Sequence, residues 1–224
     1  MIADAIGDIL PMAVGVALSP FPIVGVVLML ATPRARTNGL AFLLGWVGGL
    51  ALVGTIVLLV AGGVGASDGA EPESWVSVVQ LVLGAALLLL AVRQWRRRPT
   101  GEAEPPLPKW MQTIDTFASG KALAFGFALA AVNPKNLLLT VAAAASIAQT
   151  GLSSGDEAIA LGVFVVLGTL GPGLPVAIYF AAGGRAQHIL GELRRWLVHN
   201  NVAIMAVLLL VIGAKLIGDG VAGL

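Results

Sequence analysis

The residues best suited to chemistry are a lysine and its polar neighbours, set inside a long apolar stretch. Asn133, Pro134, Lys135 and Asn136 stand between the segments AFGFALAAV and LLLTVAAAA. A charge near the centre of such a stretch is costly to bury and usually serves a function. Lys135 therefore predicts a site for an anionic group such as a carboxylate or phosphate, which the two asparagines would help to hold. The alternative is a lysine that only satisfies freed backbone carbonyls.

A similar arrangement of a polar residue and proline occurs earlier in the chain. Ser19 and Pro20 are followed by Pro22, again within apolar sequence. Proline lacks an N–H group and clashes with the preceding helical turn, so Pro20, Pro22 and Pro134 predict kinked or broken helices. Proline also suits the first turn of a helix, and Ser19 and Asn133 are suitable N-cap residues. Each new helix start would add about half a positive charge beside the central lysine.

A third candidate element is the segment GTLGPGLP. Its glycines and prolines predict a loosened helix that acts as a hinge or lines a pore, and the alternative is close helix packing. The residues concerned are Gly171, Pro172, Gly173 and Pro175.

An enzyme is the weakest functional hypothesis. Ser19 and Lys135 would form a Ser–Lys dyad in principle, but Ser19 is better explained as a helix cap. The apolar runs contain no pair of carboxylates or histidines and no metal-ligand cluster, and the chain has no cysteine. We predict no catalytic residue, no metal and no cofactor.

Composition defines the elements that position these residues. The chain is 58% hydrophobic and 11% charged, whereas soluble domains have about 25% charged residues. A soluble enzyme, a nucleic-acid-binding protein and a disordered chain are therefore excluded. A membrane-spanning helix needs about 20 apolar residues, and six apolar runs are long enough. They are residues 9–31, 38–62, 75–92, 122–148, 158–182 and 202–218.

The positions of the charges predict the orientation. All lysines and arginines except Lys135 and Lys215 lie in the first, third and fifth loops, and the second and fourth loops hold acids only. Basic loops stay in the cytoplasm, so both termini are predicted to lie outside the cell membrane. The first run carries acids instead of a positive n-region, which indicates an uncleaved span.

The chain is predicted to be a single all-α transmembrane domain, residues 1–224, built from two inverted repeats of three helices. Matching Ser19-Pro20 to Asn133-Pro134 gives repeat one as 1–93 and repeat two as 121–224, joined by a cytoplasmic linker with an amphipathic helix at 94–120. A second amphipathic segment, 185–200, is expected on the inner membrane surface. Inverted repeats with broken helices are typical of secondary transporters.

At these motifs the chain resembles the LysE superfamily of exporters. Within it, ALSPFPIVGVVLMLATPRARTNGLAFLLGWVGG is similar to the GAP family of peptidoglycolipid and sulfolipid addressing proteins, which are Sap-like. The resemblance implies six spans in two inverted repeats, export, and often a dimer, for which the GxxxG spacing of Gly45 and Gly49 offers a packing face. The family motifs fall on Ser19, Pro20, Pro22, Asn133, Pro134 and Lys135. Amino-acid exporters of the superfamily usually carry a PGP-like element in the first span, so SPFP favours the lipid-associated branch. The branch that exports divalent cations relies on intramembrane carboxylates, which these spans lack.

Together these observations predict an exporter that moves an anionic or amphipathic solute, a lipid or lipid-linked precursor, from the cytoplasmic side outward. It would work by alternating access at a midplane site, with membrane lipids as partners, a homodimer as the assembly and no nucleic acid. The alternatives are an accessory scaffold of a lipid-export machine and an amino-acid exporter of the same superfamily.

Overall fold

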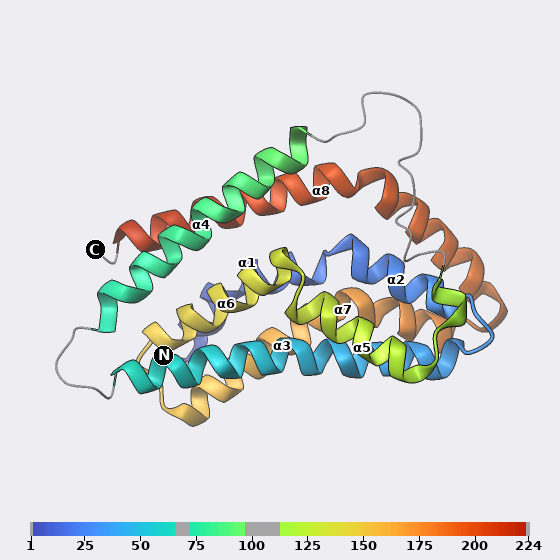
Figure 1. The fold of residues 1–224 in the computed structure, drawn as a ribbon, viewed down its shortest axis with the longest axis horizontal. Helices are drawn as coiled ribbons and strands as arrows, with labels where there is room; N and C mark the ends of the chain where they lie inside the picture. Colours follow the sequence, from blue (N-terminus) through green and yellow to red (C-terminus); the bar gives the residue numbers. More distant parts are fainter. Residues whose placement is uncertain (1, 66–71, 97–112, 223–224) are drawn as a thin grey trace.

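The computed structural model describes residues 2–65, 72–96 and 113–222, and this part of the chain is helical throughout (Figure 1). Two short 3-10 turns, η2 (Ile114–Thr116) and η3 (Gly183–Arg185), precede α5 and α8. The α-helices are α1 (Ile2–Ala17), α2 (Pro20–Leu30), α3 (Ala35–Gly65), α4 (Pro72–Arg96), α5 (Ser119–Ala131), α6 (Pro134–Gln149), α7 (Ser154–Ala181) and α8 (Ala186–Ala222).

Two of the apolar runs are broken helices, as the prolines predict. α1 and α2 meet at an angle of 49°, and α5 and α6 meet at 61°. Pro20 and Pro134 stand at the first positions of α2 and α6, where the missing N–H costs no helical hydrogen bond. α3, α4, α7 and α8 each contain one segment long and apolar enough to cross a membrane. Four to six membrane spans result, depending on whether each bent pair counts as one.

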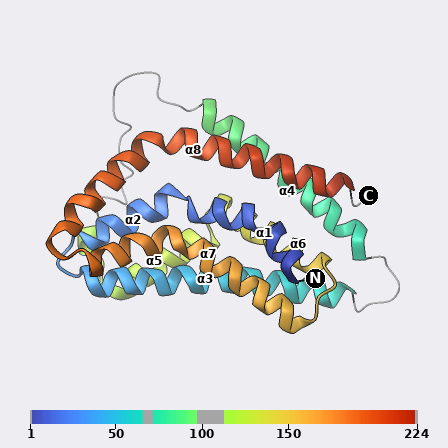
Figure 2. The same cartoon turned by 180° about the vertical axis from the view of Figure 1, so that it is seen from behind.

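The helices pack in two groups, visible from both sides in Figures 1 and 2. α3 lies along α5, and α1 packs against α6 and α7. α4 lies along α8, and this pair meets the remaining helices mainly where α4 touches α6 and α8 touches α2 and α7. The two broken helices therefore face the α4–α8 pair.

Glycine allows the closest of these contacts. A Cβ atom added at Gly45 of α3 would overlap the Leu123 carbonyl of α5, and one at Gly126 of α5 would overlap the Phe42 carbonyl of α3. A Cβ atom at Gly49 of α3 would come within 2.7 Å of the Ala130 Cβ atom of α5. The GxxxG face of α3 is thus used within the chain, so these glycines do not supply the expected dimer contact.

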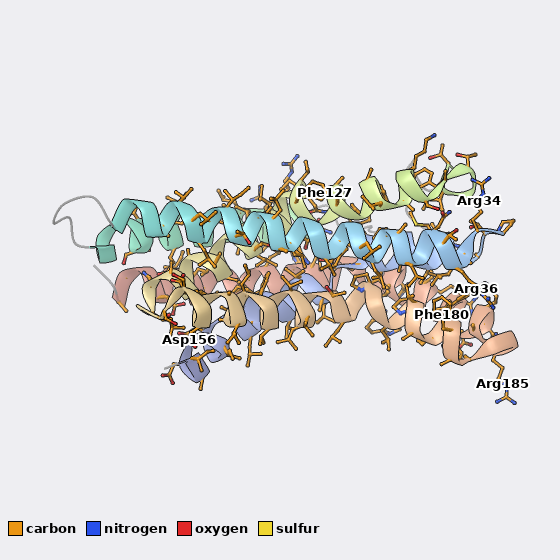
Figure 3. All side chains as sticks on the ribbon, turned by 90° about the horizontal axis from the view of Figure 1, so that it is seen from below. Arg34, Arg36, Phe127, Asp156, Phe180 and Arg185 are labelled. Atoms are coloured by element: carbon orange, nitrogen blue, oxygen red, sulfur yellow. The ribbon has the colours of Figure 1, made fainter. Side chains whose placement is uncertain are left out.

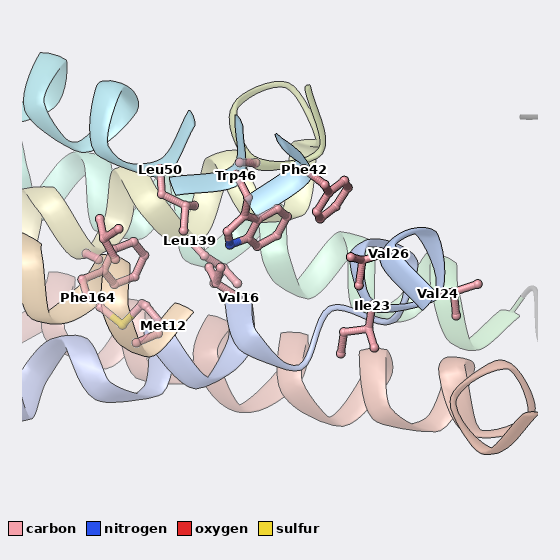
Figure 4. Close-up of a cluster of buried hydrophobic side chains, with 14 of the residues drawn as sticks. Met12, Val16, Ile23, Val24, Val26, Phe42, Trp46, Leu50, Leu139 and Phe164 are labelled. Atoms are coloured by element: carbon pink, nitrogen blue, oxygen red, sulfur yellow. The ribbon is translucent and has the colours of Figure 1, made fainter. Parts of the chain in front are cut away.

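The cluster of buried side chains in Figure 4 lies between the first broken helix, α1 and α2, and the helices α3, α6 and α7. Phe42 and Trp46 of α3 are fully buried and stacked, with ring centroids 6.4 Å apart. Met12 and Val16 of α1 and Leu139 of α6 fill the space below them. This packing fixes the end of α1 against the start of α6.

The charged ends of the described helices are separated, as Figure 3 shows. Arg34, Arg36 and Arg185 lie at one end of the molecule, and Asp156 lies at the other. Both chain termini are at the end where Asp156 lies. Labelled arginines of the predicted first and fifth loops thus lie at one end of the molecule, and the labelled aspartate of the predicted fourth loop lies at the opposite end.

Of the two predicted interfacial helices, one differs from the structure and the other lies mostly outside the described residues. Residues 185–200 are not a separate surface helix, because α8 continues through them into the apolar part without a proline to stop it. Leu190 and Leu197 are buried, and the Gln187 amide donates to the Leu30 carbonyl at the end of α2 at 2.9 Å. Most of the helix predicted within 94–120 lies outside the described residues. At its described end, Ile114 is fully buried in the 3-10 turn η2.

Candidate functional site

The first break separates α1 from α2 without a side-chain cap. Ser19 has the extended backbone of an N-cap residue, but its side chain caps nothing. Its backbone N–H donates to Val16, three residues back, at 3.1 Å. In an unbroken helix that N–H would reach the Gly15 carbonyl, so the break leaves the Gly15 oxygen available. The prediction of the N-cap position was correct, and the prediction of a capping hydroxyl was wrong.

The second break has the predicted cap. The Asn133 side chain accepts a hydrogen bond from the Lys135 backbone N–H at 3.1 Å. The Asn133 N–H donates to Ala128, five residues back, so the Leu129 carbonyl loses its helical donor. Each break thus leaves carbonyl groups at the end of its first half-helix without a helical donor, among them those of Gly15 and Leu129.

The first turn of α6 satisfies both carbonyls. Lys135 Nζ donates to the Gly15 oxygen at 2.7 Å, and Asn136 Nδ2 donates to the Leu129 oxygen at 2.9 Å. The Ser19 hydroxyl completes the connection by donating to Asn136 Oδ1 at 2.7 Å. Ser19 and Asn136 are both buried. The two breaks, far apart in the sequence, therefore meet through side chains of the predicted site.

The helix ends at the two breaks contribute little net charge to the site. A helix N-terminus carries about half a positive charge and a C-terminus about half a negative charge. The ends of α1 and α5 reach the same region as the starts of α2 and α6, so the four helix ends nearly cancel. The positive charge at the breaks is that of Lys135 itself.

A cavity of about 360 Å³ opens beside the breaks. Its walls combine apolar side chains with amide, hydroxyl and cationic groups, and no carboxylate is among the described residues that line it. The lining residues are Ser19, Pro20, Phe21, Pro22, Leu90, Arg93, Gln94, Asn133, Pro134, Lys135, Met205 and Leu209. Lys135 is half-buried there, and its Nζ also lies 3.8 Å from Met205 Sδ.

The cavity joins most of the residues predicted for the site and adds others. Asn136 is the exception among them, because it lies behind the cavity wall, fully buried. Arg93 and Gln94 of α4 were not predicted as site residues. In the sequence, a basic residue at the end of a span indicates orientation and not a binding site. Met205 of α8 had no polar signal in the sequence at all. Only the packing of the α4–α8 pair onto the breaks reveals these residues.

The glycine- and proline-rich segment of α7 is not a third break. α7 continues from Ser154 to Ala181 through Pro172 and Pro175, both of which are buried. A Cβ atom at Gly171 would overlap the Ala17 carbonyl at the end of α1. This segment supports the first break by close packing and does not line the cavity. Its role as a hinge stays a prediction.

The catalytic alternative receives no support from the geometry. The Ser19 hydroxyl donates to Asn136, and Lys135 Nζ donates to Gly15, so the two side chains of the hypothetical dyad are bonded elsewhere. Among the described residues, no group of three or more His, Cys, Asp or Glu side chains is arranged to hold a metal ion.

Comparisons with known proteins find one family model, and its match includes the sequence of both breaks. No curated protein and no solved structure gives a significant match. The family model described as Sap, sulfolipid-1-addressing protein, matches residues 9–222. The chain therefore belongs to the sulfolipid-1-addressing protein family.

Proposed function

We propose that this protein is a membrane transporter that moves an anionic amphiphile, a lipid or lipid-linked precursor, from the cytoplasmic side outward. The family description supports a role in lipid addressing or export. The observation that carries the proposal is the cavity at the two breaks. Lys135 faces it without a carboxylate among the described lining residues, beside apolar walls that suit an acyl chain.

The contact between Lys135 and the Gly15 carbonyl is compatible with a binding role. An ammonium group has three donors, and the carbonyl takes one of them at good distance. A ligand anion would therefore find the ammonium group held in place and still able to donate.

The arrangement of helices supports two inverted repeats. Each proposed repeat consists of a broken pair and two long helices, α1 to α4 and then α5 to α8. The contacts also correspond, since α3 packs on α5 where α7 packs on α1, and α4 packs on its own counterpart α8. Alternating access would follow from movement of the α4–α8 pair against the breaks.

The orientation follows from the same helices. The end that carries Arg34, Arg36 and Arg185 is assigned to the cytoplasm by the positive-inside rule, which places both termini outside. A homodimer remains part of the proposal, through a surface other than the α3 glycines.

The test measures the movement of fluorescent lipid between the two leaflets of liposomes that contain the purified protein. Head groups labelled with a quenchable dye are followed for phosphatidylglycerol and for phosphatidylcholine. We expect the wild type to accelerate transfer of the anionic lipid, Lys135→Met to abolish this and Lys135→Arg to retain part of it. Lys121→Met is the matched control, because Lys121 is exposed at the start of α5 and outside the cavity.

The competing function is an accessory scaffold. If Lys135→Met folds and transfers lipid as the wild type does, or if neither lipid moves faster than in empty liposomes, the transporter proposal fails. Thermal unfolding of each variant in detergent separates loss of transport from loss of fold.

A further inference from the structure

We infer that Arg93 determines ligand specificity, as a second positive contact that holds the anionic head group together with Lys135. The inference rests on the proposed function and concerns the same cavity. It assigns a role to a residue that the sequence pattern marks only as an orientation signal.

Arg93 reaches the cavity from a different group of helices than Lys135. It lies in the last turn of α4, and Leu90, Arg93 and Gln94 of this helix all line the cavity. Their spacing of three and four residues places them on one face of the helix. Lys135 comes from α6, in the group that contains both breaks. A ligand between the two cations would therefore contact both helix groups.

The two cations differ in what they already bind. Lys135 Nζ is held by the Gly15 carbonyl at 2.7 Å. No ion pair or hydrogen bond of the Arg93 side chain is found within the described part of the chain, and no acidic side chain is among the described residues that line the cavity. Among the described residues, the donors of Arg93 are therefore available to a ligand.

Arginine suits this task better than a second lysine would. Its planar guanidinium group presents paired donors that match two oxygens of one anionic group. A sulfate or phosphate group presents oxygens in several directions, so it can engage Arg93 and Lys135 together, whereas a planar carboxylate presents two oxygens in one plane. Gln94 and Asn133 add amide groups for hydroxyls of the same head group. We therefore assign to the cavity a tetrahedral oxyanion head group in preference to a carboxylate.

The test compares Arg93→Gln with Arg96→Gln in the full chain. Arg96 lies in the same last turn and carries the same charge, but it does not line the cavity. Dissociation constants are measured by thermal shift in neutral detergent with added phosphatidic acid, cholesterol sulfate, oleic acid or phosphatidylcholine. Arg93→Lys serves as the conservative variant, because it keeps the charge and removes the paired donors.

We expect Arg93→Gln to weaken binding of phosphatidic acid and cholesterol sulfate by about tenfold to a hundredfold, the range of a charge-assisted hydrogen bond. Arg93→Lys should recover part of this loss, and Arg96→Gln should bind as the wild type does. Oleic acid should bind more weakly than either oxyanion lipid, with a smaller effect of Arg93→Gln.

Three results would overturn the inference. They are equal effects of the two glutamine variants, full recovery with lysine, and tighter binding of oleic acid than of the oxyanion lipids. Failure of the proposed function looks different. If Lys135→Met also leaves binding of every lipid unchanged, the cavity is not an anion site. If Lys135→Met abolishes binding and Arg93→Gln does not, the cavity binds anions through Lys135 alone.

Discussion

The two helix breaks have nearly the same sequence pattern and different chemistry. Both place a polar residue before a proline that begins a new half-helix. At the second break the polar residue caps its own helix, since Asn133 accepts from the Lys135 N–H. At the first break Ser19 turns away from its helix and donates to Asn136. The first break is thus completed from outside, by the first turn of α6, and the second break is completed locally.

This difference indicates which hydrogen-bonded side chain of the site contributes most to the free energy of unfolding. Asn136 is fully buried and bonds to groups from both breaks. Asn133 is half-buried beside the cavity and bonds only to its own helix. Substitutions at the shared residue should therefore cost more than substitutions at the local cap, and four changes test that order.

Asn136→Leu should have the largest effect. It removes the partners of the Ser19 hydroxyl and of the Leu129 carbonyl, and each buried polar group left without a partner costs about 1–3 kcal/mol. The free energy of unfolding, measured by titration with a denaturing detergent, should fall by roughly 2–6 kcal/mol. Thr140→Val is the control on the same helix, because the Thr140 hydroxyl bonds only to the Asn136 backbone carbonyl within α6. Equal losses for the two variants would mean that Asn136 does not join the breaks.

Ser19→Ala should have the next largest effect. It leaves Asn136 Oδ1 without its donor in a buried position, which predicts a loss of about 1–3 kcal/mol in the free energy of unfolding. The loss should largely disappear when Asn136→Leu is already present, because the two residues share one bond. Additive losses in the double variant would contradict the connection between the breaks.

Asn133→Ala should cost less than either. Loss of an N-cap side chain typically lowers stability by about 1 kcal/mol, and no other described group depends on this side chain. The same denaturing-detergent titration measures the effect. A loss as large as that of Asn136→Leu would show that the second break also depends on a distant partner.

The sequence predicts the breaks well because proline acts locally. A missing N–H and a fixed φ angle favour the first turn of a helix, and at Pro20 and Pro134 a polar residue that can precede a helix stands directly before the proline, so these two prolines locate both half-helix starts. Asn133 was predictable as a cap for the same reason, since its bond reaches only two residues along the chain. Six apolar runs likewise follow from length and hydropathy, which need no partner.

What the sequence does not predict is set by contacts across the chain. The Ser19 hydroxyl has a choice between its own helix and Asn136, 117 residues away, and only the packed structure decides it. The same holds for Pro172 and Pro175, which lie in an unbroken α7 because Gly171 lets that helix pack against the end of α1. Arg93 is a third case, since its place in the cavity depends on how α4 lies against α6.

Asn133→Ser should have the smallest effect on stability and the clearest meaning for function. Serine and asparagine are about equally good N-caps, so the free energy of unfolding should change by only a few tenths of a kcal/mol. Serine lacks the amide group that Asn133 presents beside the cavity. If the amide contacts the ligand, this variant keeps its stability and transfers fluorescent phosphatidylglycerol more slowly in liposomes. Unchanged transfer would show that Asn133 acts only as the N-cap of α6. Ligand recognition would then depend on Lys135 and Arg93, and the second break would hold Lys135 in place without binding the ligand through Asn133.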